Sequence, residues 1–132
     1  MIVLDTHILV WWISGDTKLS AAAKKTIAKH LPIDRSILIS SITAWEIAML
    51  VEKGRLVLNM EVTGWLAEVS KIPSVEFVPV DNVVGVNSTC LPGAFHKDPA
   101  DRMIVAFARQ GSYPLVTADE KILNYKHVKT VW

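Results

Sequence analysis

Short runs rich in apolar residues recur along the chain and alternate with longer segments in which apolar residues follow a helical period. The runs lie at 2–4, 37–39, 75–80, 115–117 and 128–131, and the first two are wholly apolar. Short apolar runs are typical of strands that are buried on both faces of a parallel sheet. The alternation predicts a three-layer α/β/α fold with a central, mostly parallel sheet of about five strands, in a single domain over 1–132.

Capping residues place the predicted helices between these runs. We expect helices at 6–13, 21–30, 41–53, 60–72, 82–90, 99–110 and 120–125. Gly15 and Gly54 follow two of them, as C-terminal glycines do, and Asn59 is the expected cap of the helix to residue 72. Asp98 followed by Pro99 is a strong helix start, because it combines a capping carboxylate with a proline at the first helical position.

Composition argues against a disulfide-bonded or zinc-binding protein, but it does not decide the function. The 132 residues are 51% hydrophobic and carry a formal net charge of +1, which neither favours nor excludes a nucleic-acid partner. The single cysteine, Cys90, cannot form an intramolecular disulfide, and no Cys/His spacing suggests zinc. The N-terminus has no basic segment before a long apolar run, so we expect a soluble, cytoplasmic protein.

Acidic side chains follow the predicted strands or begin the next helix. Ligands of parallel α/β sheets bind beyond the carboxyl ends of the strands, so these acids should meet at one edge. They are Asp5, Glu46, Asp98, Asp101 and Asp119. Crowded carboxylates repel one another, and a divalent cation removes the conflict. Oxygen ligands suit Mg²⁺ or Mn²⁺, which in turn suit phosphodiester hydrolysis.

Each acid also has a purely structural interpretation. Asp5 and Asp119 could simply cap the helices that follow them. Glu46 lies three residues after Thr43 and could complete a capping box, although its helix is otherwise very apolar. For Asp98 the cap is the favoured interpretation, whereas Asp101, where its helix becomes apolar, is the better candidate for function.

Other polar residues near the proposed edge are less specific. For His7 and His96, a ring bonded to the backbone is favoured over a role in proton transfer or phosphate binding. Arg102 could contact phosphate or the acids, or form a structural ion pair. The tryptophans are favoured as core or dimer-interface residues: Trp11, Trp12, Trp45 and Trp65. Adjacent Trp11 and Trp12 cannot both face one core, so one of them is a candidate partner contact.

Four segments together resemble the PIN-domain family, and within it the VapC-type toxins of bacterial and archaeal toxin–antitoxin pairs. They are 2–7 (IVLDTH), 41–48 (SITAWEIA), 96–106 (HKDPADRMIVA) and 115–119 (LVTAD), in the family's order. The resemblance implies a PIN-like fold and a Mg²⁺- or Mn²⁺-dependent endoribonuclease. It also implies an RNA substrate, a cognate antitoxin protein and a homodimer.

The same resemblance assigns the site residues. The catalytic and metal-binding acids would be Asp5, Glu46, Asp101 and Asp119. Supporting positions would be Thr6, Asp98, Arg102 and Thr117.

Two other classes of protein fit the acid pattern in part. A signalling receiver also gathers acids around Mg²⁺, but it has an acid pair after its first strand, where this chain has Asp5 followed by Thr6. A catalytically idle RNA- or protein-binding domain of the same fold is the other alternative.

Overall fold

A five-stranded, wholly parallel sheet forms the centre of the protein in a computed structural model that describes residues 1–132. The strands lie in the order β3-β2-β1-β4-β5. Their bounds are β1 Ile2–Leu4, β2 Ile37–Ser40, β3 Val75–Val78, β4 Leu115–Val116 and β5 Thr130–Val131. The order reverses direction at β1, so β1 and its neighbours form the switch point at which ligands bind in such sheets.

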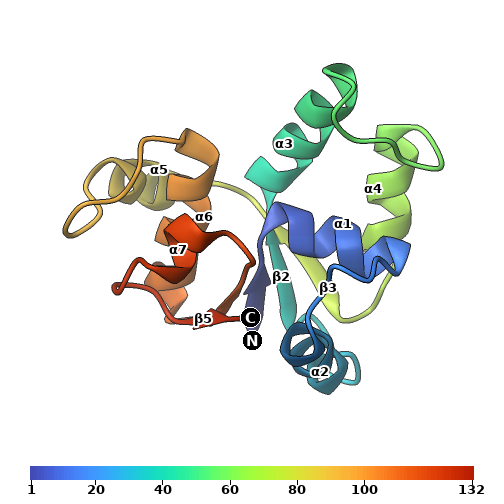
Figure 1. The fold of residues 1–132 in the computed structure, drawn as a ribbon, viewed down its shortest axis with the longest axis horizontal. Helices are drawn as coiled ribbons and strands as arrows, with labels where there is room; N and C mark the ends of the chain where they lie inside the picture. Colours follow the sequence, from blue (N-terminus) through green and yellow to red (C-terminus); the bar gives the residue numbers. More distant parts are fainter.

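Seven helices cover the sheet. They are α1 Thr6–Ser14, α2 Ala21–His30, α3 Ser41–Glu52, α4 Val62–Ser70, α5 Asn82–Thr89, α6 Pro99–Gly111 and α7 Glu120–Leu123. In Figure 1, α5, α6 and α7 lie together on one side of the strands, while α1, α2 and α4 lie on the other. No helix is both long and apolar enough to cross a membrane.

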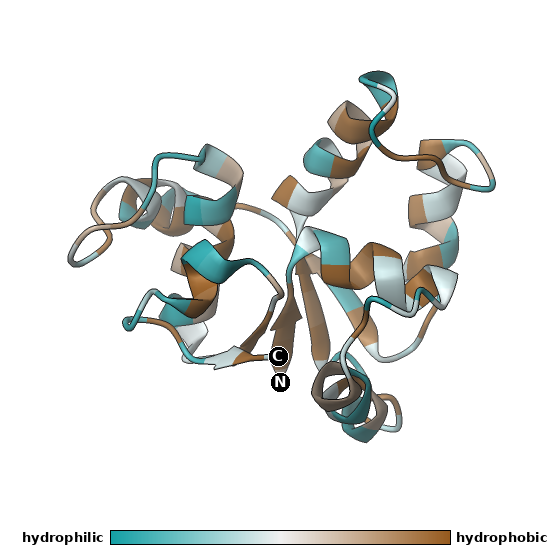
Figure 2. Ribbon diagram, viewed as in Figure 1, coloured by the Kyte–Doolittle hydropathy of each residue, from teal (hydrophilic) through white to brown (hydrophobic).

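Side-chain alternation along β1 divides the apolar interior into two clusters. Ile2 and Leu4 join the cluster beneath α1, α2 and α4, whereas Val3 joins the cluster beneath α5, α6 and α7. Val3 pairs with Leu38 and Leu115, so one buried row crosses three strands. Figure 2 shows these central strands as hydrophobic and the outer helices as mixed. The apolar runs are continuous because both faces of the sheet are covered.

The structure confirms the predicted α/β/α fold and shortens several elements. The β3 strand ends at Val78, where its pairing with Ser40 ends, and β5 has two residues because β4 offers only two partners. Asn59 was a wrong prediction for the cap of α4. Glu61 is the cap, because its carboxylate accepts hydrogen bonds from both the Thr63 and Gly64 N–H groups.

The end of α6 also differs from the prediction, in which the helix runs to residue 110 and Gly111 follows it. Gly111 is the last helical residue, and Ser112 takes the left-handed conformation at φ 54°. A Cβ on Gly111 would lie only 2.1 Å from the Tyr113 ring. Glycine is therefore needed here for close packing, whereas Gly15, at φ 68°, is the expected left-handed cap of α1.

Candidate metal centre

Four chain segments bring the predicted acids to the carboxyl edge of β1, β2 and β4. Asp5 follows β1 directly, Glu46 lies on α3 after β2, Asp101 lies in the first turn of α6, and Asp119 follows β4. The charges of the other three acids each affect the pKa of Asp101. The sequence prediction that these groups lie close together therefore agrees with the geometry.

Asp5 is the buried centre of this group. One of its carboxylate oxygens accepts the Thr6 N–H at 2.9 Å, and the other accepts the Thr117 hydroxyl at 2.7 Å. Burial raises the pKa of the Asp5 carboxyl, and these hydrogen bonds oppose the rise. Asp5 also caps α1, so the structural and functional interpretations of this residue are compatible.

Glu46 is attached to the same network through Thr6. The Thr6 hydroxyl donates to the Glu46 carboxylate at 2.5 Å and lies 3.0 Å from the Thr43 hydroxyl. The capping-box interpretation of Glu46 is wrong, because Ser40 caps α3 and no backbone N–H bonds the glutamate. Burial raises the pKa of Glu46, and the charge of Asp5 adds to the rise.

Asp98 and Asp101 were each candidates for the helix cap and for the metal site, and the structure gives them different positions. Asp98 is exposed and caps α6 by accepting the Asp101 N–H at 3.0 Å. The Asp101 side chain is only 14% exposed and faces the cluster. Burial, followed by the charges of the neighbouring acids, raises the pKa of Asp101 to about 8. The carboxyl therefore holds a proton at neutral pH unless a cation compensates the crowded charge.

Thr117 connects the fourth acid to the first. Its hydroxyl donates to Asp5 and accepts the Asp119 N–H at 3.1 Å, and the residue is fully buried. Asp119 also caps α7 by accepting the Lys121 N–H at 2.9 Å. A single buried hydroxyl therefore sets the relative position of two carboxylates from different strands.

His96 joins the acids, although the sequence favoured a backbone-bonded histidine there. Its Nε2 lies 3.0 Å from an Asp101 carboxylate oxygen. The ligand atoms of His96, Asp101 and Asp119 all lie within 4.8 Å of one another. Asp5 and Glu46 lie outside this group of three and belong to the neighbouring hydrogen-bonded network. The carboxylate oxygens of the site suit a divalent cation such as Mg²⁺ or Mn²⁺.

Arg102 points away from the acids. Its guanidinium donates to the backbone carbonyls of Ser88, Phe95 and His96 at 2.7–3.1 Å. Arg102 forms no ion pair with an acid, so that interpretation is wrong, while a phosphate contact stays a prediction. Arg102 instead ties the loop before α6 to the end of α5, and in doing so it fixes the backbone of His96.

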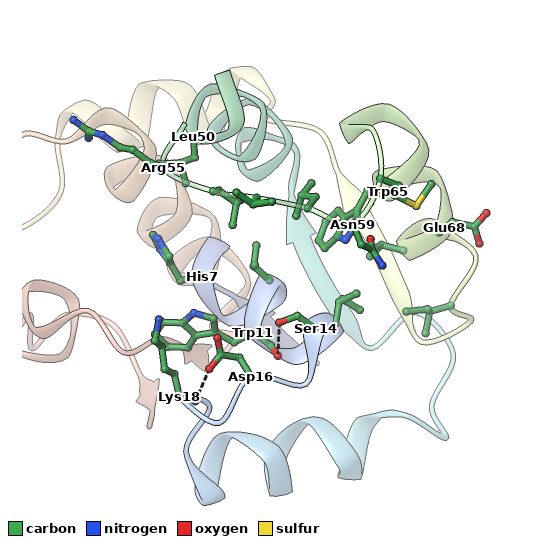
Figure 3. Close-up of a pocket in the computed structure, with 18 residues that line it drawn as sticks. His7, Trp11, Ser14, Asp16, Lys18, Leu50, Arg55, Asn59, Trp65 and Glu68 are labelled. Atoms are coloured by element: carbon green, nitrogen blue, oxygen red, sulfur yellow. Dashed lines mark hydrogen bonds between the residues drawn. The ribbon is translucent and has the colours of Figure 1, made fainter. Parts of the chain in front are cut away.

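A groove of about 910 Å³ lies beside the acids, between α1, the end of α3, the 53–61 loop and α4. Figure 3 shows His7 and Trp11 at one end of this groove and Trp65 and Glu68 at the other. His7 is exposed on α1, and its charge affects the pKa values of both Asp5 and Glu46. The groove therefore begins next to the acid cluster.

Four tryptophans, predicted to lie in the core or a dimer interface, differ in their burial. Trp65 is buried, whereas Trp45 is 55% exposed. Trp11 and Trp12 both pack partly against the core, and Trp11 also lines the groove. Trp11 is thus the member of the adjacent pair that is available to a partner.

The sequence of the chain matches a known family over nearly its full length. Residues 2–128 match the PIN domain family. The chain belongs to the PIN domain family. A curated relative, Ribonuclease VapC22 of Mycobacterium tuberculosis, is 32% identical over 99% of this chain and 98% of its own. A PIN domain is not a signalling receiver, so the family match argues against that alternative.

Solved structures of similar fold include members of toxin–antitoxin complexes. One is in VapBC2 from Rickettsia felis bound to a promoter DNA fragment, with TM-score 0.70, 20% identity and coverage of 98% of this chain and 97% of that chain. Another is in a toxin–antitoxin complex from Klebsiella pneumoniae, with TM-score 0.65, 18% identity and coverage of 97% and 95%. At these identities the likeness establishes the PIN fold of this chain.

Proposed function

We propose that this PIN domain is a Mg²⁺- or Mn²⁺-dependent endoribonuclease and the toxin of a type II toxin–antitoxin pair. The observation that carries the nuclease assignment is the meeting of Asp5, Glu46, Asp101 and Asp119 at one sheet edge. The relative named Ribonuclease VapC22 supports RNA as the substrate. A single-stranded or looped RNA fits best, because its backbone is accessible to an edge of this kind.

The four acids would hold the cation. Asp101 and Asp119 offer ligand atoms within 4.8 Å of one another, and Asp5 is the buried acid beside them. A divalent cation here supplies Lewis-acid stabilisation of phosphate charge and lowers the pKa of water. The residues of the chain do the positioning. Thr6 and Thr117 donate hydrogen bonds to Glu46 and Asp5, and these bonds fix the carboxylate oxygens before RNA binds.

A matched pair of glutamates on α3 tests this proposal. Glu46→Gln removes the charge in the cluster, while Glu52→Gln removes an exposed charge at the end of the same helix. We expect E46Q to lose RNA cleavage in Mg²⁺ or Mn²⁺ and E52Q to keep it. Equal cleavage by the two variants, measured on a labelled single-stranded RNA, would contradict the assignment.

The groove beside the acids is the proposed site for the antitoxin. Its lining is mainly apolar, and exposed Val57 and Met60 form part of it. An apolar segment of a partner would bury this surface, and a basic residue following that segment could reach the acids past His7. The toxin–antitoxin complexes among the structures of similar fold support this partner class.

Val57→Asp tests the groove without touching the acids. Val57 is 89% exposed, so the substitution should leave stability and cleavage unchanged. We expect V57D to lose co-purification with the product of a short reading frame adjacent to its own gene. Retained co-purification of V57D would place the antitoxin elsewhere. The expected homodimer and cytoplasmic location remain predictions.

A further inference from the structure

His96 lies against the acids, and its backbone and its ring each contact another residue of the protein. Its backbone carbonyl accepts a hydrogen bond from Arg102 at 3.1 Å. The Phe95 ring packs edge-on against the imidazole with 4.5 Å between centroids. The fixed backbone and the Phe95 contact favour one orientation of the imidazole, so the ring is pre-organised to present one nitrogen in one direction.

That nitrogen, Nε2, is fully buried and has no hydrogen-bond partner in the protein. It lies 3.0 Å from the Asp101 oxygen, yet the two groups are not aligned for a hydrogen bond. Buried polar atoms are normally satisfied, so an unpartnered nitrogen beside a carboxylate needs an explanation.

The spacing matches that of two ligands on one ion. Neighbouring ligands of an octahedral ion, each about 2.1 Å from it, lie about 3 Å apart, and opposite ligands about 4.2 Å apart. The His96–Asp101 distance is 3.0 Å, and the three ligand atoms of His96, Asp101 and Asp119 lie within 4.8 Å. In such a pair the nitrogen lone pair points at the ion and misses the neighbouring oxygen.

We propose that His96 is a nitrogen ligand of the metal ion held by Asp101 and Asp119, and that it makes the site prefer Mn²⁺ over Mg²⁺. The proposal rests on the metal-dependent function proposed above. Imidazole is a good ligand for transition metals and a poor one for Mg²⁺, which takes oxygen ligands. A site made only of carboxylates would have no nitrogen ligand with which to distinguish Mn²⁺ from Mg²⁺.

Electron spin-echo spectroscopy of the Mn²⁺-loaded full chain tests the ligand directly, because it detects nitrogen bonded to the ion. We expect ¹⁴N modulation in the wild type, loss of it in His96→Gln and retention in His7→Gln. His7 is the matched control, because it is the other histidine whose neighbours include the acids. Wild-type Mn²⁺ without ¹⁴N modulation, or modulation that persists in H96Q, would overturn the proposal.

Calorimetric titration with each metal alone tests the selectivity. We expect H96Q to weaken Mn²⁺ binding about 10- to 100-fold and Mg²⁺ binding by less than about threefold. Equal weakening of both metals would overturn the proposed preference. Metal-dependent RNA cleavage combined with Mn²⁺ bound by oxygen alone would refute only the role of His96. RNA cleavage in EDTA with no Mn²⁺ bound would refute the metal centre itself.

Discussion

The acid cluster and the groove meet at α1, but they are built in opposite ways. The acid cluster is polar, and its central residues Asp5, Thr6 and Thr117 are buried and joined by hydrogen bonds. The groove is mainly apolar, and its 53–61 wall carries the exposed side chains of Val57 and Met60. Hydrogen bonds orient the carboxylates of the cluster, whereas the groove offers exposed apolar side chains to a partner.

The contrast separates the two functions proposed for this protein. Substitutions in the acid cluster should change cleavage and metal affinity while leaving partner binding intact. Substitutions in the groove wall should do the reverse, because Val57 lines a groove whose lining includes none of the four predicted metal ligands.

Asp101→Asn should remove RNA cleavage, by more than about 100-fold, because it deletes a charged ligand. The same change should raise the free energy of unfolding of the metal-free protein, because it relieves repulsion among crowded acids. Cleavage rates and urea denaturation in EDTA measure the two effects. Asp34→Asn, at an exposed position before β2, is the control and should alter neither. An active D101N, or one much less stable than the wild type, would contradict this account.

Thr117→Val should lower cleavage about 10- to 100-fold, because the Asp5 oxygen loses its donor while side-chain volume is kept. The free energy of unfolding should fall by about 1–3 kcal/mol, since a buried acceptor is left without a partner. Thr89→Val, at an exposed position on α5, is the matched control. If T117V and T89V behaved alike, the hydroxyl would not be positioning Asp5.

The stability of the metal-free protein should fall as pH rises from about 4 to about 8. Folded Asp101, with its pKa raised from 3.8 to about 8, holds a proton in this range that the unfolded chain releases. Asp5 and Glu46, whose pKa values are also raised, act in the same direction. Thermal unfolding in EDTA at several pH values should show a shallower slope for D101N. A wild-type slope equal to that of D101N would contradict the buried, crowded position of Asp101.

Asp98 should show the smallest effect, although it lies close to the other acids in the sequence. Asn caps helices as well as Asp does, so Asp98→Asn should change stability by less than about 0.5 kcal/mol. Asp98→Ala should cost about 1 kcal/mol, because the Asp101 N–H loses its acceptor. We expect D98N to keep cleavage within a few-fold of the wild type. A loss as large as that of D101N would make Asp98 a ligand as well as a cap.

The sheet and the acids could be predicted because their signals are local. Apolar runs identify buried strands, and acids directly after strands meet at one edge whatever the helix packing. The cap of α4 could not be predicted, because it depends on the path of the 53–61 loop into the helix. That path places the Glu61 carboxylate, and not Asn59, beside the first N–H groups of α4. The role of His96 could not be predicted, because it depends on how the loop before α6 turns its ring towards Asp101 and on the approach of Asp119, which is distant in the sequence.

The groove was missed for a related reason. Its wall is a loop without periodicity, and only Trp11 carried a signal, through the adjacency of two tryptophans. The hydrogen-bond partners of Arg102 could not be predicted from the sequence either. All three are backbone carbonyls, in a loop and at a helix end, and any residue type supplies a carbonyl.

The most direct test of the account is a single time course of RNA cleavage. A labelled single-stranded RNA is incubated with the wild-type protein and Mn²⁺, excess EDTA is added midway, and Mn²⁺ is then restored. We predict that cleavage stops on chelation, resumes on restoration, and is absent throughout for Asp5→Asn. Cleavage that continues in EDTA, or that D5N performs at the wild-type rate, would contradict the claim that these carboxylates form a metal-dependent nuclease centre.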